Sequence, residues 1–322
     1  MKWVQGLMAL LAICASASGF AQEKFPQRPL RLVLSVPPGG AADFTGRVVG
    51  AKLAEFLRQN VVIEGRPGAG GIVASEYVTR ATPDGHTLML TSSTTHGVAP
   101  VLYKKLPYDA IKGFTHISLV VVLPAMMAIN ADVPAKTVKE FIALAKSKPG
   151  AYLFTSAGNG SVPQLIGEQL KILTGVSMTH VPYKGSGLAV VGLAAGEVHL
   201  MFDGLPSLIG QIKSGRLRPL AAMTEKRFAL FPDVPTIAEA GLPGMEGGVW
   251  YGLSGPAGVP RPIVERLAKE IARVVARPDV QERFATVGGI PAASSPSEYV
   301  AFIMKDNKKW GEVVRISGVS PD

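Results

Sequence analysis

Cysteine is almost absent from this chain of 322 residues, because its single cysteine, Cys14, lies in the N-terminal segment. If that segment is removed on export, as argued in the next paragraph, the mature protein has no thiol. This excludes disulfide bonds, a thiol nucleophile and a cysteine-ligated metal centre. An exported chain of this length can fold without disulfides because it can bury a sufficient hydrophobic core.

The N-terminal segment has the pattern of a secretory signal peptide. Lys2 supplies a short basic start, and residues 7–17 form an apolar stretch too short to span a bilayer. Gly19 and Ala21 occupy the positions of a cleavage site. We therefore predict a signal peptide over residues 1–21, cleaved near Ala21 (a cut after Ala17 is the alternative), and a periplasmic mature protein. After residue 21, no apolar run reaches transmembrane length.

Long basic blocks and enzyme motifs are also missing. The formal net charge of the full chain is +9, and removal of Lys2 with the N-terminal segment lowers it by one, to +8. No dense basic block interleaved with aromatic residues accompanies this charge, so we expect no nucleic acid partner, only modest attraction of anions. The histidines lack metal-ligand spacing, and neither a serine-nucleophile elbow nor a nucleotide fingerprint occurs. We predict no catalytic residues, no metal and no cofactor.

What the chain does contain is a regular alternation of strand and helix patterns. Hydrophobic residues make up 47% and charged residues 18% of the chain, which is typical of a globular protein. Stripes with helical spacing, such as Val264, Leu267, Ala268 and Ile271, fall between short apolar runs. This alternation predicts an α/β fold with largely parallel sheets. The expected strands cover residues 30–36, 61–64, 87–91, 117–123, 126–129, 152–156, 178–181, 198–202, 220–223 and 249–253.

Two of these expected strands, 117–123 and 249–253, are continuously apolar and lie on either side of a central block the size of one domain. We interpret them as crossover strands that form a hinge between two lobes. The first lobe is then discontinuous, and the predicted boundaries are 25–124 plus 245–322 for lobe I and 125–244 for lobe II.

Two glycine-rich turns between a strand and a helix are the most informative local feature. One covers residues 32–43 and contains Gly39 and Gly40; the other covers residues 152–161 and contains Gly158 and Gly160. Small residues at the start of a helix leave several backbone N–H groups free at the positive end of the helix dipole. Two such turns in a two-lobed chain predict a cleft that holds an acidic ligand from both sides.

Five further segments carry a family resemblance. They read VVIEGRPGAGG at 61–71, PDGHTL at 83–88, LYKKLPYD at 102–109, HVPYKG at 180–185 and FPDVPT at 231–236. Together they resemble the tripartite tricarboxylate transporter receptors, the Bug family, from about residue 25 to residue 320. The resemblance implies a two-lobed periplasmic-binding-protein (Venus flytrap) fold. Such a fold has two mostly parallel sheets flanked by helices, with two crossover strands.

The resemblance also implies where the ligand binds. Three loops contribute in the family: those around 38–43 and 156–161, and the turn at 92–96. Positions around 183–185 and 203 line or support the cleft. The predicted ligand-binding residues are Pro38, Gly39, Gly40, Asp43, Ser92, Thr94, Ser156, Ala157, Asn159, Gly160, Ser161, Gln164, Tyr183, Lys184 and Asp203.

Several of these residues also have a purely structural interpretation. Asp43 stands near a helix start, where it can complement the helix dipole, and we favour this role because a carboxylate would repel an acidic ligand unless Arg47 balanced it. Lys184 can pair with an acid or remain solvated. Asp203 can hold a loop by accepting backbone hydrogen bonds. Each serine or threonine hydroxyl can donate to a carboxylate or cap a helix.

The function implied by the resemblance is capture of a small organic carboxylate and its delivery to the membrane permease subunits of the transporter, by a monomeric receptor. Val36 stands where the family often has an aromatic residue, and Gln164 where it often has a histidine, which leaves room and a neutral amide. We expect a dicarboxylate, aromatic or aliphatic, with a monocarboxylate next. The alternatives are an exported hydrolase or isomerase using Asp43 or Asp203 as base, and a receptor that docks a sensor.

Overall fold

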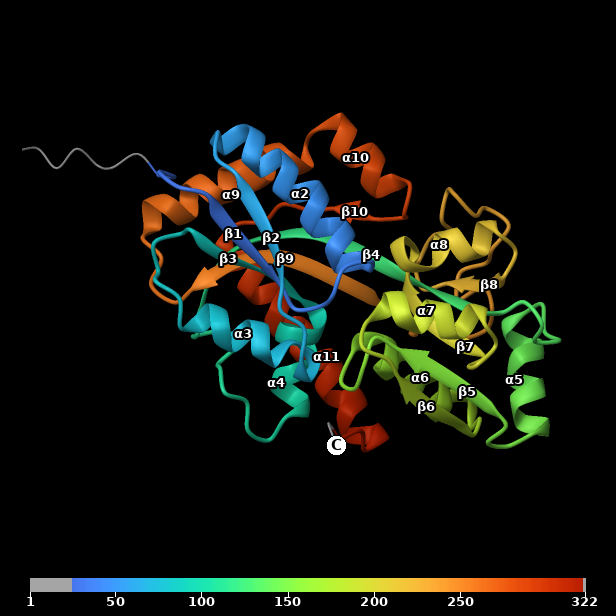
Figure 1. Ribbon diagram of the computed structural model, residues 1–322. Helices are drawn as coiled ribbons and strands as arrows, with labels where there is room; N and C mark the ends of the chain where they lie inside the picture. Colours follow the sequence, from blue (N-terminus) through green and yellow to red (C-terminus); the bar gives the residue numbers. More distant parts are fainter. Residues whose placement is uncertain (1–24, 321–322) are drawn as a thin grey trace, which may run out of the picture.

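The computed structural model describes residues 25–320, so the predicted signal peptide lies outside the described residues. The molecule has two lobes side by side, each an α/β unit (Figure 1). Within the described residues, ten strands join in one sheet with the order β2-β1-β3-β9-β4-β7-β5-β6, while β8 and β10 pair with β4. The strands are β1 (Leu30–Leu34), β2 (Val61–Gly65), β3 (Thr87–Ser92), β4 (Phe114–Asn130), β5 (Tyr152–Ser156), β6 (Met178–Pro182), β7 (Leu200–Gly204), β8 (Leu217–Ala222), β9 (Gly248–Pro256) and β10 (Ile290–Pro291).

Strand pairing is parallel in the outer parts of this sheet and antiparallel in its middle. β1 pairs in parallel with β2 and β3 at one end, and β5 pairs in parallel with β6 and β7 at the other. The long strands β4 and β9 pair antiparallel with each other. β9 also pairs antiparallel with β3, and β4 pairs antiparallel with β7. The expected two parallel sheets are therefore the two ends of one curled mixed sheet, joined through its antiparallel centre.

Residues 117–123 and 126–129, expected as separate strands, form the single strand β4. Its residues up to Pro124 pair with β9, and pairing with β7 begins at Ala125. Pro124 has no N–H, but it stands where the pairing changes partner, so little is lost there. We propose that this change marks the lobe boundary, with lobe I comprising residues 25–124 and 245–320 of the described chain and lobe II residues 125–244.

Helices cover the sheet in both lobes. In lobe I, α2, α9 and α10 lie above the sheet in the view of Figure 1, and α3, α4 and α11 below it. The lobe I helices are α2 (Ala41–Leu57), the short turns η1 (Ala69–Gly71) and η2 (Ser93–Val98), α3 (Ile72–Thr79), α4 (Ala99–Leu102), α9 (Arg261–Val275), α10 (Pro278–Ala285) and α11 (Pro296–Ser317). Those of lobe II are α5 (Val138–Ser147), α6 (Val162–Thr174), α7 (Ser186–Ala194) and α8 (Leu205–Lys213).

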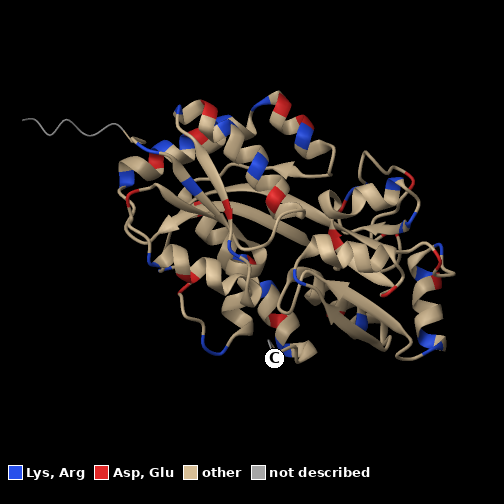
Figure 2. Ribbon diagram, in the orientation of Figure 1, with Lys and Arg blue, Asp and Glu red and all other residues tan. Residues whose placement is uncertain are grey.

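The helices form where the sequence has one apolar face. In α9, Val264, Leu267, Ile271 and Val274 are buried on the side that faces the core, as their spacing predicts. Charged residues cover the outer faces, and Figure 2 shows Lys and Arg interspersed with Asp and Glu over both lobes rather than gathered in one block. Within residues 25–320, none of the helices combines the length and the hydrophobicity of a transmembrane span.

Candidate functional site

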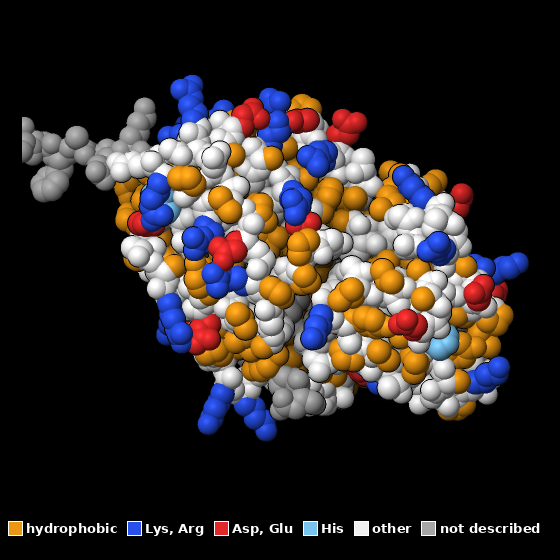
Figure 3. Space-filling model, in the orientation of Figure 1, with side chains coloured by type: hydrophobic (Ala, Val, Ile, Leu, Met, Phe, Trp, Pro, Cys, Tyr) orange, Lys and Arg blue, Asp and Glu red, His pale blue; other side chains and the backbone are white. Residues whose placement is uncertain are grey.

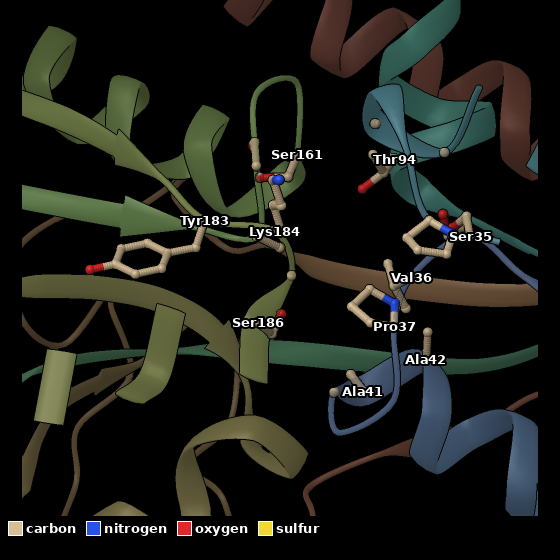
Figure 4. Close-up of a pocket in the computed structure, with 18 of the residues that line it drawn as sticks. Ser35, Val36, Pro37, Ala41, Ala42, Thr94, Ser161, Tyr183, Lys184 and Ser186 are labelled. Atoms are coloured by element: carbon tan, nitrogen blue, oxygen red, sulfur yellow. Dashed lines mark hydrogen bonds between the residues drawn. The ribbon is translucent and has the colours of Figure 1, made fainter. Parts of the chain in front are cut away.

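A cavity of about 860 Å³ lies between the two lobes. Figure 3 shows the seam where the lobes meet, flanked mainly by hydrophobic and uncharged groups. Figure 4 shows that the labelled residues come from the two lobes and face one another across the cavity. Lobe I contributes Ser35, Val36, Pro37, Ala41, Ala42 and Thr94, and lobe II contributes Ser161, Tyr183, Lys184 and Ser186. The lining residues are Ser35, Val36, Pro37, Pro38, Gly40, Ala41, Ala42, Pro67, Gly68, Ala69, Gly70, Gly71, Ser92, Ser93, Thr94, Ala157, Gly158, Asn159, Ser161, Pro163, Pro182, Tyr183, Lys184, Gly185, Ser186, Gly187, Leu188, Asp203, Val249 and Tyr251.

The cavity is built from loops that follow parallel strands. In each lobe the carboxyl ends of the parallel strands share one edge of the sheet, which is where ligands bind in open α/β sheets. Four helices, α2, α3, α6 and α7, begin at this edge, and the residue that precedes each of them makes no side-chain cap hydrogen bond. The first N–H group of α3, that of Ile72, already donates to Ala69 O, and Pro163 in the first turn of α6 has no N–H. Free N–H groups at helix starts favour an anion. The cavity wall therefore carries positive potential without a cluster of cationic side chains.

The first predicted loop places the start of α2 in the lobe I wall. Gly39 has φ 101°, a backbone conformation that favours glycine, and Gly40 precedes the helix in an extended conformation. Pro38 and Gly40 line the cavity, while Gly39 and Asp43 do not. Asp43 accepts a hydrogen bond from Gly39 N at 3.2 Å and pairs with Arg47 Nε at 2.9 Å. These contacts give Asp43 a structural role in shaping the loop, the interpretation favoured from the sequence.

The second predicted loop forms part of the lobe II wall, and its polar groups largely bind one another. Ser161 Oγ donates to Gly158 O at 2.7 Å, and Gln164 Oε1 accepts from Gly160 N at 2.7 Å. Ala157, Asn159 and Ser161 line the cavity, while Ser156, Gly160 and Gln164 do not. Hydrogen bonds within the loop therefore fix its shape, and the Ser161 hydroxyl and the Gln164 amide oxygen are already used in them.

Ser156 lies behind this loop and is paired with a histidine. Its Oγ is 2.7 Å from His180 Nε2 and donates to Gly158 O at 2.9 Å. Burial lowers the pKa of His180 to about 4, so this imidazole is neutral near neutral pH. The Ser156 hydroxyl therefore orders the loop and does not face the cavity.

The turn after β3 brings hydroxyl groups into the lobe I wall. Ser92 forms a capping box with Thr95, accepting from Thr95 N at 3.3 Å, so its hydroxyl is partly engaged although the residue lines the cavity. The Thr94 hydroxyl points into the space between the lobes (Figure 4). Ser93 belongs to the predicted turn at 92–96 but was not among the individually predicted ligand-binding residues, and it also lines the cavity. Its side chain is fully buried, and its Oγ has no hydrogen-bond partner among the described residues.

Tyr183, Lys184 and Asp203 complete the predicted set from lobe II, and all three line the cavity. The Tyr183 ring points away from lobe I in Figure 4, and its hydroxyl donates to Glu197 at 2.7 Å. Lys184 is exposed. Asp203 is only 2% exposed. Lys184 and Asp203 are the only charged side chains among the described residues that line the cavity.

The loop at 67–71 also lines the cavity, and we had interpreted it only as a turn and a family motif. It follows β2 and leads into α3, so it repeats the strand–glycine–helix pattern of the two predicted loops. Its position in the site depends on β2 lying beside β1. Gly71 is tightly packed, because a Cβ there would lie 2.5 Å from Thr95 Cγ2. The strand–glycine–helix pattern of this loop was visible in the sequence, but the pairing of β2 with β1, which brings the loop to the cavity, was not.

Small residues allow the two lobes to touch at the cavity rim. A Cβ on Gly187 would lie 3.5 Å from the Gly39 carbonyl oxygen, and one on Gly185 would lie 3.3 Å from Pro37 Cγ. The starts of α2 and α7, which belong to different lobes, therefore approach each other nearly backbone to backbone. The starts of helices from both lobes therefore border the same cavity.

Comparison with known proteins identifies the family. The model of the tripartite tricarboxylate transporter family receptor matches residues 45–319. The chain belongs to this family. Because the family and the structural neighbours are substrate-binding receptors, this member is a solute receptor and not an enzyme, and the hydrolase or isomerase alternative is wrong. Asp43 and Asp203 are therefore not catalytic bases.

Solved structures of related receptors confirm the two-lobed fold. The periplasmic binding protein BugD is 32% identical with a TM-score of 0.87, over 92% of this chain and 99% of that one. R. palustris Rpa4515 with adipate is 31% identical with a TM-score of 0.89, over 92% and 99%. MatC from Rhodopseudomonas palustris with bound malate is 33% identical with a TM-score of 0.85, over 90% and 100%. This chain is thus a receptor of the periplasmic-binding-protein type.

Proposed function

We propose that this protein captures a small organic carboxylate, most favourably a dicarboxylate, in the cavity between its lobes. The observation that carries the proposal is the convergence of uncapped helix starts from both lobes, α2 and α3 from lobe I and α6 and α7 from lobe II, on one cavity. A carboxylate accepts charge-assisted hydrogen bonds from such N–H groups. Adipate and malate, the ligands of two related receptors, are both dicarboxylates, which supports this class.

The proposed contacts come from three parts of the wall. In lobe I, Gly40 and the first residues of α2 present N–H groups, and the Thr94 hydroxyl donates to the same ligand. In lobe II, the starts of α6 and α7 contribute, and the exposed Lys184 adds positive charge. The remaining lining is largely apolar and suits the carbon chain or ring of the ligand.

The proposal includes the route that follows capture. The mature receptor starts after Ala21, binds its ligand in the periplasm and releases it to the membrane permease of a tripartite tricarboxylate-type transporter. Membership of a transporter receptor family supports a permease as the partner. A sensor protein as partner is not favoured by any feature of the structure.

A thermal-shift screen of the mature protein over mono-, di- and tricarboxylates, aliphatic and aromatic, tests the ligand class. A ligand present at 100 times its dissociation constant stabilises the folded state by about 2.7 kcal/mol. We expect several dicarboxylates to raise the melting temperature, and neutral sugars of similar size to leave it unchanged. Stabilisation by sugars and by no carboxylate would contradict the proposal.

A further inference from the structure

The turn η2 differs from the rest of the cavity wall because its backbone is bound by a residue near the other end of the chain. Five of its six residues are buried, and Thr94 is the half-buried one. The Thr94 hydroxyl points into the space between the lobes (Figure 4). The hydrogen bonds that fix this turn therefore decide where the hydroxyl lies.

The local sequence removes one of the backbone donors that would otherwise serve the carbonyl groups of this turn. η2 has a wide, π-helical form, in which the N–H group of Ala99 donates to Thr94 O, five residues back. The next residue, Pro100, has no N–H group, so it cannot donate to the carbonyls four and five residues before it, those of His96 and Thr95. Both of these residues are fully buried, and a buried carbonyl that lacks a donor is costly.

Side chains from elsewhere in the chain supply donors to these carbonyls. The Tyr108 hydroxyl donates to Thr95 O at 2.7 Å. The amide of Asn307, on α11, donates from Nδ2 to His96 O and to Gly97 O, at 2.6 Å each. An amide NH2 group has two donors, so both are used here. Asn307 thus completes the hydrogen bonding of a turn whose His96 lies 211 residues away in the chain.

The helix α11 holds this amide firmly against the turn. It packs on η2 and on α4, below the sheet of lobe I (Figure 1). Asp306, the neighbour of Asn307, accepts a hydrogen bond from Trp250 Nε1 on β9 at 2.8 Å, which ties the helix to the sheet. Gly97 lies so close to α11 that a Cβ on it would overlap Asp306 Oδ2. Close packing of this kind fixes the position of the amide relative to the turn.

We propose that Asn307 is a positioning residue of the ligand site: its amide holds η2 in the shape that directs the Thr94 hydroxyl at the ligand. The inference rests on the proposed function, in which Thr94 donates to the carboxylate. Asn307 itself does not line the cavity, so its effect on binding passes through the turn. Without the amide, the carbonyls of His96 and Gly97 lose its hydrogen bonds, and the turn loses the contacts that fix its shape.

A double-mutant cycle with Thr94 tests this role. Calorimetric titration measures the affinities of the wild type, Asn307→Ala, Thr94→Val and the double variant. The probes are malate, adipate and whichever acid stabilises the protein most in the thermal-shift screen. Asn307→Ala should weaken binding about tenfold, as Thr94→Val does. Because the amide acts through Thr94, the double variant should also be about tenfold weaker than the wild type, whereas independent effects would multiply to about 100-fold.

A matched control separates this positioning from a general loss of stability. The amide of Asn130 also donates to two successive carbonyls, Leu193 O at 2.9 Å and Ala194 O at 3.4 Å, at the end of α7 that does not line the cavity. Asn130→Ala should lower the melting temperature, yet keep the affinity within about threefold of the wild type and show no coupling with Thr94→Val. If Asn307→Ala fails to fold, Asn307→Ser, which also removes the amide, takes its place in the cycle.

Two results would overturn the inference. One is wild-type affinity in the Asn307 variant for an acid that the wild type binds. The other is a double variant whose loss of affinity equals the product of the two single losses. In either case the wild type still binds carboxylates, so the proposed function stands while the positioning role fails. Binding of no carboxylate by the wild type would overturn the proposed function, and this inference with it.

Discussion

A Cβ placed on Gly40, at the start of α2 in lobe I, would lie 3.5 Å from the Cβ of Ser186, at the start of α7 in lobe II. One methyl group therefore fits between the lobes at this point as an ordinary contact, and a longer side chain does not. Gly40 has φ −114° and ψ −172°, a conformation open to any residue. A larger residue can therefore replace Gly40 without straining the backbone of the loop.

We predict that Gly40→Leu abolishes ligand binding while the protein remains folded. The side chain would hold the lobes apart and cover the N–H groups at the start of α2, removing several charge-assisted hydrogen bonds of about 1.5–3 kcal/mol each. Affinity should fall at least about 100-fold. Gly40→Ala, the matched control, should lose far less. Calorimetry measures the affinities, and thermal unfolding checks the fold. Wild-type affinity in Gly40→Leu would place the ligand elsewhere.

The equivalent change at Gly160 is not a clean test of the site. Gly160 has φ 72°, and a Cβ there would lie 2.4 Å from Leu102 Cδ2. A larger residue would strain the backbone and displace a buried leucine. We expect Gly160→Leu to lower the melting temperature, so a loss of binding in that variant would say nothing specific about the site.

We predict that Thr94→Val weakens carboxylate binding about tenfold or more, because the hydroxyl that points into the cavity in Figure 4 no longer donates to the ligand. Valine has nearly the same shape, so the melting temperature of the ligand-free protein should stay close to that of the wild type. Thr179→Val, on the exposed part of β6, is the matched control and should bind as the wild type does. Equal affinity in both variants would remove Thr94 from the site.

Buried neutral histidines predict how stability depends on pH. Burial lowers the pKa of His96, His116 and His180, to about 4 for the last two, against 6.5 in the unfolded chain. Below pH 6.5 the unfolded chain therefore binds protons at these histidines, whereas in the folded protein His116 and His180 stay neutral until about pH 4. The stability that these groups contribute is complete above pH 6.5 and is lost as the pH falls, by about 2 kcal/mol at pH 5 for each of His116 and His180.

Urea unfolding at pH 7 and pH 5 measures this loss. His116→Gln, which removes one of the three groups, should show a smaller difference in the free energy of unfolding between the two pH values than the wild type does. The comparison uses the difference within each protein, so a general destabilisation by the substitution does not affect it. An unchanged difference would mean that His116 is not held neutral by burial.

We expect the receptor to read both acid groups of a dicarboxylate. Esterification of one group removes a negative charge and replaces acceptor oxygens that the helix starts bind in charge-assisted hydrogen bonds, so the monoester should compete at least about tenfold less well. A competition titration against the best dicarboxylate of the screen measures this. A monoester that binds as well as the diacid would mean that only one acid group is recognised.

The family and the two-lobed α/β fold were predictable because they depend on local patterns repeated along the chain. The turn at Gly39 and Gly40, for example, combines an apolar strand, two small residues and an amphipathic helix. The merger of residues 117–123 and 126–129 into β4 was not predicted, and a proline such as Pro124 normally disfavours a continuous strand. Its effect is small only because the strand changes partner there, which is a property of the sheet and not of the local sequence.

The details of the site were less predictable for a similar reason. Ser92 and Ser93 look alike in the sequence, yet one hydroxyl is used in a capping box and the other is buried without a partner. Tyr183 lies in a family motif, but its hydroxyl binds Glu197, which is fourteen residues away in the chain. Which polar groups remain available to a ligand depends on tertiary neighbours, and these follow from the packing of both lobes.

The crystal structure of the mature protein with its best dicarboxylate is the most direct test of the account. We predict that the ligand lies in the cavity between the lobes, with one carboxylate within hydrogen-bond distance of backbone N–H groups at the start of α2 and also of those at the start of α6 or α7. A carboxylate bound by one lobe alone, or a ligand outside this cavity, would contradict the claim that helix starts from both lobes bind the acid.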